Sequence, residues 1–210
     1  MHTELIKLDL QEFLKCLDSK NVEEWERAER LYTAPLLFEN SYEWVEEYEA
    51  VYDMAYYEVL GRLLDYQRFM EGIYEDVRGD IAAAQAMLET GNLTFKGSAV
   101  TPDQNNFCGL GVTSNGMKGC SFKTLRDGVR AQIQHLKAYA SKEELVNGCV
   151  DPRYAYVEKG CAPYVEWLGQ KENPKGKGWA SGAKYGDKIK EILREMESQS
   201  TGKGQKDKNV

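Results

Sequence analysis

Residues that build metal centres are scarce in this chain. Its 210 residues include two histidines, His2 and His135, and five cysteines, none of which forms a Cys-x-x-Cys pair. Structural zinc sites need closely spaced thiolate or imidazole ligands, so a zinc centre is not expected. No motif suggests another metal or an organic cofactor. His135 lies among apolar residues of a predicted helix and is interpreted as a structural histidine.

The spacing of the cysteines leaves their redox state open. Cys108 and Cys120 flank a glycine-rich turn, and Cys149 and Cys161 have a similar spacing. Two disulfides with Cys16 left over are compatible with this spacing, and so are buried free thiols.

Long apolar runs are also missing. No stretch approaches the roughly 18 apolar residues that a membrane span needs, so no membrane span is expected. Residues 1–7 lack the apolar segment of a secretory signal. A product that works outside the cytoplasm would therefore need delivery by cell lysis, by a virion or by another non-standard route.

Negative charge is concentrated in the first third of the chain. Residues 1–76 carry 19 Asp and Glu against 7 Lys and Arg, net −12, whereas residues 77–210 carry 15 against 20, net +5. This asymmetry indicates two functional parts. The basic part favours an anionic partner, such as a cell-wall polymer or nucleic acid, and charge alone does not choose between them.

The hydrophobic pattern of the first part is helical. Apolar residues recur at helical spacing from residue 5 to about residue 76, with a break at Pro35 and a candidate helix cap at Ser41. We expect two or three acidic amphipathic helices in a region of residues 1–72. Their aromatic stripe either packs against the second part or docks a protein partner. The stripe includes Trp25, Trp44, Tyr48, Tyr52 and Tyr56.

Residues 73–197 are predicted to form one domain around a polar, glycine-rich stretch. Within that stretch, the Asn115-Gly116 pair predicts a short β-hairpin over residues 109–122. Residues 198–210 are polar and lysine-rich, which predicts a disordered basic tail. Three helices are predicted in the domain, at residues 74–89, 124–140 and 185–196.

Glu89 is the candidate general acid. It ends an apolar helical stretch just before Gly91, so its carboxyl group has an apolar side and a solvated side. Apolar neighbours disfavour the charged form and raise the pKa of a carboxyl group toward the range where it can donate a proton at neutral pH. A solvated glutamate in the last turn of a helix is the alternative.

Four blocks of sequence, taken together, resemble one enzyme family. They are similar to blocks of the glucosaminidase family, glycoside hydrolase family 73, of bacterial and phage cell-wall lysins, and they fall in the family's order over about residues 73–196. Four ordered blocks are more specific than any one of them. The blocks are residues 84–91 (AQAMLETG), 105–110 (NNFCGL), 131–137 (AQIQHLK) and 179–189 (WASGAKYGDKI).

The resemblance implies a mainly α fold, with a lysozyme-like α domain and a small β-hairpin lobe after the acidic helical region. It also implies an endo-β-N-acetylglucosaminidase that cuts the β-1,4 bond between N-acetylglucosamine and N-acetylmuramic acid in peptidoglycan. Glu89 aligns with the family's general acid, and Tyr185 aligns with a tyrosine near the scissile sugar. The expected partner is a peptidoglycan glycan strand and not nucleic acid.

Further residues of the resemblance imply substrate contacts. Asn106 and Phe107 match an element that lines the family's cleft, and Trp179 takes the place of an aromatic residue in the last block. Aromatic rings stack on the apolar faces of sugars, so Tyr154 is a further candidate for substrate binding.

A second acid is hard to find in the sequence. Residues 104–126, where many family members carry a carboxylate, contain no Asp or Glu. Asp103 is a possible second acid, and Asp127 could also position a water, although a helix cap suits Asp127 better. The remaining option is substrate assistance, in which the N-acetyl oxygen stabilises the reacting sugar and Tyr185 orients that group.

Two other functions remain open from the sequence. A lytic transglycosylase also works with a single glutamate, because the muramic 6-hydroxyl replaces water as the attacking group. A non-catalytic component of a virion or secretion apparatus would use residues 1–72 to bind a partner and the second part to hold glycan. The expected place of action is the bacterial cell wall, either extracellular or virion-associated.

Overall fold

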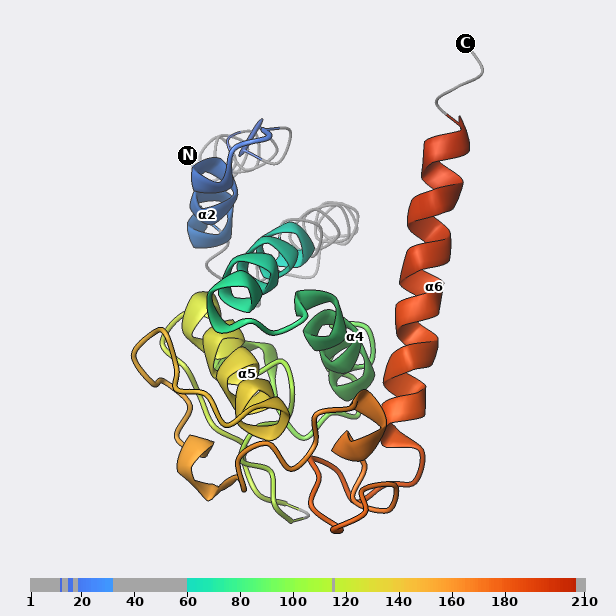
Figure 1. Cartoon of the computed structure of the whole chain (residues 1–210). Coiled ribbons are helices and arrows are strands. Elements are labelled where there is room, and N and C mark those ends of the chain that lie inside the picture. The colour runs from blue at the N-terminus through green and yellow to red at the C-terminus, as the bar shows by residue number, and fades with distance from the viewer. Residues whose placement is uncertain (1–11, 13–14, 17–18, 32–59, 115, 207–210) are drawn as a thin grey trace. The chain divides into compact units, whose positions relative to one another are not determined.

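The computed structural model describes residues 12, 15–16, 19–31, 60–114 and 116–206 (Figure 1). The chain divides into two compact units, Met1–Tyr66 and Gln67–Val210. Most of the aromatic stripe of the first unit, together with Pro35 and Ser41, lies outside the described residues. In the described part, no helix is long and apolar enough to cross a membrane.

In the first unit, α2 spans Val22–Leu31. The side chain of Asn21 precedes the helix, and its Oδ1 accepts a hydrogen bond from the backbone N–H of Glu23 at 3.0 Å. Side-chain acceptors at this position satisfy an N–H group that the helix leaves unpaired. The Trp25 indole donates to the Ser19 carbonyl at 2.7 Å, and the Arg62 guanidinium lies 5.6 Å from the centre of the Trp25 ring. The described helix is therefore acidic and amphipathic, as the sequence predicts.

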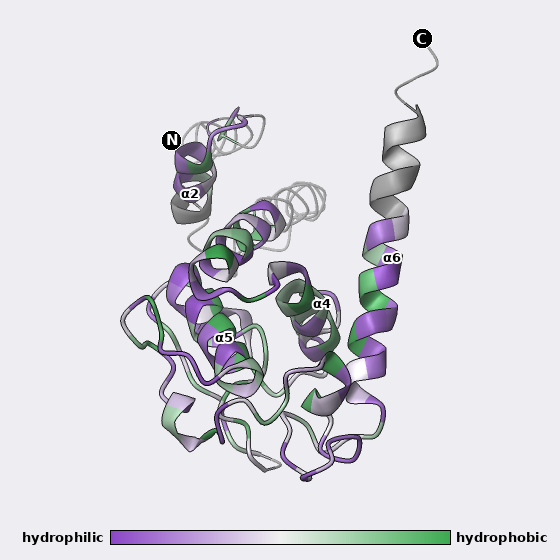
Figure 2. Cartoon of the chain, viewed as in Figure 1, coloured by the Kyte–Doolittle hydropathy of each residue, from purple (hydrophilic) through white to green (hydrophobic). Residues whose placement is uncertain are grey.

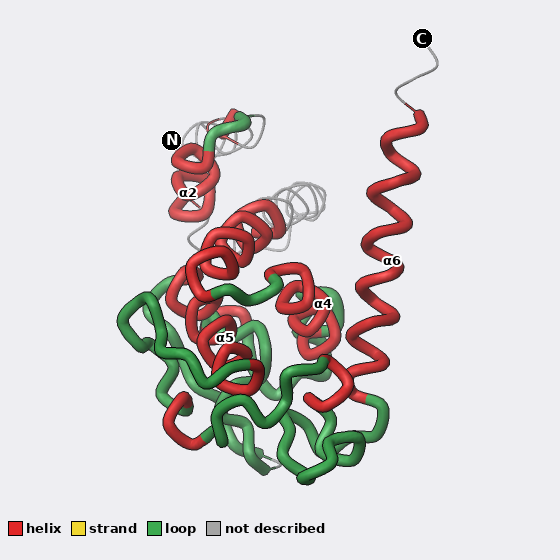
Figure 3. Tube along the Cα trace, in the orientation of Figure 1, coloured by secondary structure: helices red, strands yellow, loops and turns green. Residues whose placement is uncertain are grey.

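The second unit is mainly helical, which confirms the predicted fold class (Figure 3). Residues 67–75 are helical, and α4 contacts both α5 and α6. Buried alanines of α4 allow the neighbouring helices to approach closely; they are Ala82, Ala83, Ala84 and Ala86. Along the coloured first part of α6, polar and apolar residues alternate in the pattern of a helix with one packed face (Figure 2). The α-helices are α4 (Gly79–Thr90), α5 (Leu125–Ala140) and α6 (Tyr185–Lys206), and the short 3-10 helices are η1 (Pro102–Gln104), η2 (Tyr154–Tyr156) and η3 (Val165–Leu168).

The junction before α4 differs from the prediction of one helix over residues 74–89. The preceding helix ends at residue 75, Asp76 has a left-handed backbone with φ of 52°, and α4 begins at Gly79. A Cβ atom on Gly79 would lie 2.7 Å from the carbonyl oxygen of Arg68. The two helices therefore meet backbone to backbone at this glycine, and the helical periodicity of the sequence does not reveal such a contact.

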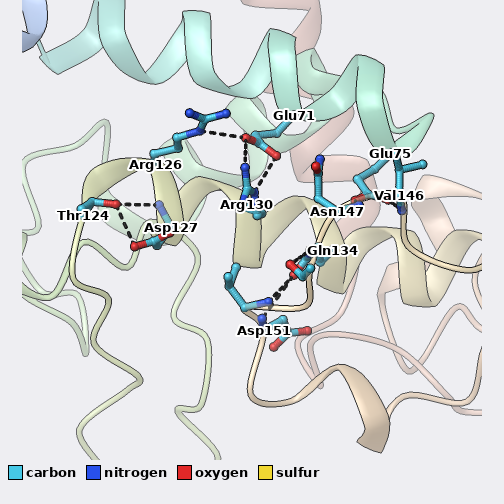
Figure 4. A network of polar contacts seen from close by, with 12 residues as sticks. Glu71, Glu75, Thr124, Arg126, Asp127, Arg130, Gln134, Val146, Asn147 and Asp151 are labelled. Atoms are coloured by element: carbon cyan, nitrogen blue, oxygen red, sulfur yellow. Dashed lines mark hydrogen bonds and ion pairs between the residues drawn. The ribbon is translucent and has the colours of Figure 1, made fainter.

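The start of α5 confirms the predicted cap. The Thr124 hydroxyl oxygen accepts from the backbone N–H of Asp127 at 3.1 Å and donates to the Asp127 carboxylate at 2.9 Å (Figure 4). This reciprocal contact satisfies a free N–H group in the first turn. Thr124 is thus the capping residue, and the Asp127 carboxylate holds its hydroxyl in place.

Two buried glutamates fasten residues 67–75 to the rest of the second unit (Figure 4). Glu71 accepts from Arg126 and makes two contacts with Arg130, at 2.9 and 3.0 Å. Glu75 accepts from two successive backbone N–H groups at residues 146 and 147, both at 3.0 Å. Buried charges persist only where they are paired or hydrogen-bonded in this way.

The glycine-rich stretch contains no strand among its described residues, so the expected β-hairpin lobe over 109–122 is not formed as a ladder. One backbone hydrogen bond crosses the stretch, from the Cys120 N–H to the Leu110 carbonyl at 2.7 Å, and side chains bind further carbonyls. The Asn106 amide donates to the carbonyls of Leu110 and Cys120, both at 2.9 Å, and the Gln104 amide donates to the Gly119 carbonyl at 3.0 Å. In the described residues the β-structure is one isolated parallel bridge between Gly169 and Ala180.

The end of the chain also differs from the expectation. Residues 198–206, for which the composition predicts disorder, continue α6 as helix; residues 207–210 lie outside the described part. A helix that is already formed supplies carbonyl acceptors for each added residue, so a polar extension costs little to propagate. All five cysteines are described, and all are unpaired.

Candidate active site

A cleft of about 740 Å³ lies in the second unit. Its volume is typical of a site for a small molecule or a short segment of polymer. Its floor and walls come mostly from loops that α4 and α5 support. It is lined by Glu89, by residues 97–99, 108–113, 153, 156, 157, 170 and 178–182, and by His135 and Tyr139 of α5.

Glu89 reaches this cleft from the last turn of α4. Gly91 closes the helix in a left-handed conformation, with φ of 60°, and its N–H donates to the Met87 carbonyl. Glycine adopts this conformation without steric cost, so the helix stops here and leaves Glu89 at its edge. Gly109 faces the carboxyl group: a Cβ atom at that position would lie 3.5 Å from Oε2 of Glu89. Oε2 therefore lies next to the Gly109 backbone, and both residues line the cleft.

Tyr185, the first residue of α6, is 6% exposed and points at Glu89. Its hydroxyl donates to Oε1 of Glu89 at 2.5 Å. It also accepts from the Gln85 amide at 3.1 Å, and Gln85 in turn accepts from the Gln132 amide at 2.9 Å. Each hydrogen bond in this series is donated in the direction of Glu89. Because the Tyr185 oxygen already accepts from Gln85, its hydroxyl proton is directed to Oε1 of Glu89.

The surroundings of these two residues shift both pKa values. Burial raises the pKa of Glu89, and the hydrogen bond from Tyr185 opposes part of that rise. The pKa of Tyr185 lies well above its usual range because of burial, the nearby Glu89 charge and the hydrogen bond to Glu89, with the Gln85 bond acting the other way. Tyr185 is therefore a neutral donor, and Glu89 retains a proton to higher pH than an exposed glutamate.

Trp179 is held on the cleft wall by its neighbours. On one side of it, the Ala180 N–H donates to the Leu168 carbonyl at the end of η3, and the Ala180 carbonyl accepts from the Gln170 N–H; on the other side, the Gly178 carbonyl accepts from the Tyr139 hydroxyl. The edge-to-face contact of Trp179 with His135 has a centroid distance of 4.7 Å. The Trp179 ring is thus fixed as a sugar-stacking surface would need to be.

His135 has a structural role in this wall, as the sequence suggested. It is buried, and its Nδ1 lies 2.6 Å from Oδ2 of the buried Asp151. Tyr139 packs on the same histidine, and its hydroxyl donates to the Gly178 carbonyl at 3.2 Å. Burial raises the pKa of Tyr139 to about 12. Both rings therefore support Trp179 and the backbone beside it.

Four residues singled out from the sequence lie outside the cleft lining. Asn106 and Phe107 are buried behind the 108–113 loop, where Asn106 bonds the loop backbone and Phe107 packs edge-on against Phe95. Tyr154 is covered by the Lys159 ammonium, 3.0 Å from its ring centre. Asp103 is exposed on η1. Asn106 and Phe107 thus shape the loop that carries Gly109.

Glu89 is the one carboxylate among the described residues that line the cleft. In the described part of the chain, no three His, Cys, Asp or Glu side chains are grouped to hold a metal ion. The chemistry available from these side chains is therefore proton donation by one carboxylic acid, with aromatic and amide surfaces around it.

Sequence reasoning missed the two glutamines behind the site and two residues of the cleft itself, Arg153 and Tyr156. Gln85 left a signal, since it stands alone as a polar residue within the buried run of α4. Buried amides are rare without a partner, so this position could have been marked as part of a polar network. Arg153 and Tyr156 carried no comparable signal.

Comparison with known proteins identifies the family of this chain. An uncharacterized protein of Borreliella burgdorferi (strain ATCC 35210 / DSM 4680 / CIP 102532 / B31) is 44% identical over 126 residues, which are 60% of this chain and 58% of that protein. The chain therefore matches less than two thirds of that relative's length. No solved structure matches the chain. The family described as mannosyl-glycoprotein endo-beta-N-acetylglucosaminidase matches residues 65–198, which include α4, the cleft and the start of α6. The chain belongs to this glucosaminidase family of glycoside hydrolases.

Proposed function

We propose that this chain is a peptidoglycan hydrolase that cleaves the β-1,4 bond between N-acetylglucosamine and N-acetylmuramic acid, with Glu89 as the general acid. One observation carries the proposal. Glu89 lies at the wall of the cleft, its pKa is raised by burial, and the Tyr185 hydroxyl binds one of its two oxygens at 2.5 Å. A carboxylic acid that holds its proton beside a sugar-sized cleft is what glycoside hydrolysis requires.

The hydrogen bond from Tyr185 selects which oxygen carries the proton. Oε1 accepts from the tyrosine, so the proton of the neutral acid resides on Oε2. Oε2 is the oxygen beside Gly109, which lines the cleft together with Glu89. Glu89 therefore presents its proton toward the leaving glycosidic oxygen. In this role Tyr185 positions the acid and does not touch the sugar.

Stabilisation of the positive charge on the reacting sugar then comes from the substrate. With no second carboxylate among the described residues of the cleft, the N-acetyl oxygen of the sugar is the nucleophile or charge partner that we propose. Asp103, exposed on η1, is not a second acid in this scheme. Trp179 provides the stacking surface for a sugar ring, while Asn106 and Phe107 position the loop next to Glu89.

A lytic transglycosylase is the second candidate, and the lone carboxylate of the cleft favours it equally. In that reaction the muramic 6-hydroxyl attacks in place of water, and Glu89 serves as acid and then as base. The two reactions leave different ends on the product. Hydrolysis leaves a reducing end, and the transglycosylase leaves an anhydro-muramic end.

The deciding experiment is digestion of purified peptidoglycan by the wild type and by Glu89→Gln, followed by mass spectrometry of the released fragments. Reducing N-acetylglucosamine ends that vanish in the variant are the expected result. Anhydro-muramic ends would assign the transglycosylase. An absence of products from walls of several bacteria would leave a glycan-binding component without catalysis and refute both enzymes.

The substrate places the action of this protein at the bacterial cell wall, outside the cytoplasmic membrane or on a virion. We further propose that the acidic region of residues 1–72 docks a protein partner there. Neutralising the acidic residues of α2, such as Glu23 and Glu24 in its first turn, should then reduce retention at the wall of producing cells without changing digestion of purified wall.

A further inference from the structure

The cleft contains a positively charged side chain, Arg153, that has no role in the proposed proton donation by Glu89. Arg153 lines the cleft, and among the described residues no carboxylate lies within ion-pair distance of its guanidinium group. The neighbouring Asp151 is occupied: Oδ2 contacts His135, and Oδ1 accepts the backbone N–H of Arg153 at 2.8 Å. An arginine in a cleft without a carboxylate partner from the protein is suited to bind a planar anion of a ligand.

Tyr156 gives this cation a platform. The Arg153 guanidinium lies 5.3 Å from the centre of the Tyr156 ring, and Tyr156 lines the cleft with 78% of its surface exposed. Both residues belong to the turn around η2, in which the Tyr156 N–H donates to the Arg153 carbonyl at 3.0 Å. A guanidinium stacked on an aromatic ring keeps its N–H edge directed outward for hydrogen bonding.

The position of this pair is fixed relative to the sugar-stacking wall. One carboxylate oxygen of Asp151 accepts from the Arg153 backbone N–H, and the other contacts His135. The His135 ring in turn packs edge-on against the Trp179 ring, with a centroid distance of 4.7 Å. Trp179 and Tyr156 are therefore joined through one buried contact between His135 and Asp151. Such second-layer hydrogen bonds define the distance between a sugar-binding surface and a charge.

We infer that Arg153 and Tyr156 form a binding site for a carboxylate carried by the glycan strand, which makes the cleft selective for muramic-acid strands over uncharged N-acetylglucosamine polymers. This inference rests on the proposed function. Two carboxylates of peptidoglycan have the required chemistry. One belongs to the lactyl group of muramic acid, which is free where the peptide has been removed, and the other belongs to the peptide stem.

The test measures binding and turnover by Arg153→Gln with three substrates: peptide-bearing strands, strands stripped of peptide by an amidase, and chitin oligosaccharides. Binding is measured in the Glu89→Gln background, so that no substrate is consumed. Loss of one charged hydrogen-bonding group should weaken binding of the anionic strands roughly ten- to hundredfold, with no change for chitin oligosaccharides. Lys175→Gln removes the same charge from an exposed residue outside the cleft and is the matched control.

The three substrates also distinguish the source of the carboxylate. Weakening with stripped strands assigns the lactyl carboxylate, and weakening with peptide-bearing strands alone assigns the stem; either result supports the site. Equal losses on chitin oligosaccharides, or unchanged binding of both anionic strands, would overturn it. If Arg153→Gln does not fold, wild-type protein is tested on strands whose carboxylates are converted to amides, and undiminished binding would again overturn the site.

Failure of the proposed function gives a different result. A wild type that releases no products yet binds anionic strands through Arg153 would refute catalysis and leave this site in place. If digestion of peptidoglycan depends fully on Glu89 but not on Arg153, the proposed catalysis is supported and the Arg153 site is refuted.

Discussion

Replacing Tyr185 with phenylalanine tests the contact on which the proposed chemistry depends. The change removes one hydroxyl group, and with it the 2.5 Å hydrogen bond to Oε1 of Glu89, while it keeps the buried ring. Because that bond lowers the pKa of Glu89, its loss should raise the pKa further, and the acid should keep its proton to higher pH. A hydrogen bond to a charged group contributes about 1.5–3 kcal/mol, which is roughly ten- to hundredfold in the protonation equilibrium.

Two opposing effects should follow in the rate. On the acidic side Glu89 is protonated in both proteins, and the variant should be slower because its proton is no longer confined to Oε2. On the alkaline side the variant should retain a larger protonated fraction than the wild type. The ratio of variant to wild-type kcat/KM should therefore rise by about tenfold or more from the acidic plateau to the alkaline limb.

The assay is the pH dependence of kcat/KM on solubilised peptidoglycan, measured by release of reducing ends. Tyr139→Phe is the matched control, because it removes a partly buried hydroxyl that binds the Gly178 carbonyl and does not touch Glu89. Any change it causes should be the same at every pH. A Tyr185→Phe ratio that stays flat or falls with pH would refute the view that this hydroxyl sets the protonation of Glu89. Thermal melting of each variant verifies that the fold is intact.

Three further changes test the fold and the buried acid. Burial raises the pKa of Glu89 in the folded state, so folding favours its neutral form and the protein loses stability as pH rises through that pKa. Glu89→Gln should therefore have a higher melting temperature than the wild type at neutral and alkaline pH. The difference should vanish below pH 4.5, the ordinary pKa of a glutamate carboxyl group. Glu71→Gln should lower the free energy of unfolding in urea by about 2–3 kcal/mol, because Arg130 loses its charged partner, and a loss under 0.5 kcal/mol would contradict a stabilising role. Gly128→Ala should lower the free energy of unfolding by about 1–3 kcal/mol, although alanine favours helix, because its Cβ would collide with the Asn105 backbone. A variant that is stabilised in the same urea titration would show that α5 and the Asn105 segment can move apart.

Local signals in the sequence predicted the elements that depend on near neighbours. The helix α5 begins where Thr124 and the apolar spacing indicate, and α4 ends before Gly91 because a left-handed residue is needed there. Glu89 could therefore be placed at a helix edge without a structure. The raised pKa of Glu89 follows from the same reasoning, since an apolar helix end removes hydration from a carboxyl group.

Contacts between distant segments could not be predicted in the same way. Gln132, Gln85 and Tyr185 are 47 and 100 residues apart, and no local pattern reports that their polar groups meet. The expected hairpin is not confirmed, for a related reason. The Asn-Gly pair is a valid turn signal, yet the two sides of that loop share one backbone hydrogen bond, from the Cys120 N–H to the Leu110 carbonyl, and the Asn106 and Gln104 amides bind other carbonyls that a strand ladder would use.

The one-way hydrogen-bond chain behind Glu89 has a consequence for how the enzyme resets between turnovers. Amide groups donate hydrogen bonds but do not relay protons, so no proton can reach Glu89 through the hydrogen-bonded series Gln132–Gln85–Tyr185. In the proposed reaction, the proton that Glu89 gives to the leaving sugar can be replaced only from a water or hydroxyl in the cleft. The substrate and the proton then reach Glu89 by the same route, through the cleft. Slow release of the product would therefore delay both reprotonation of Glu89 and binding of the next strand.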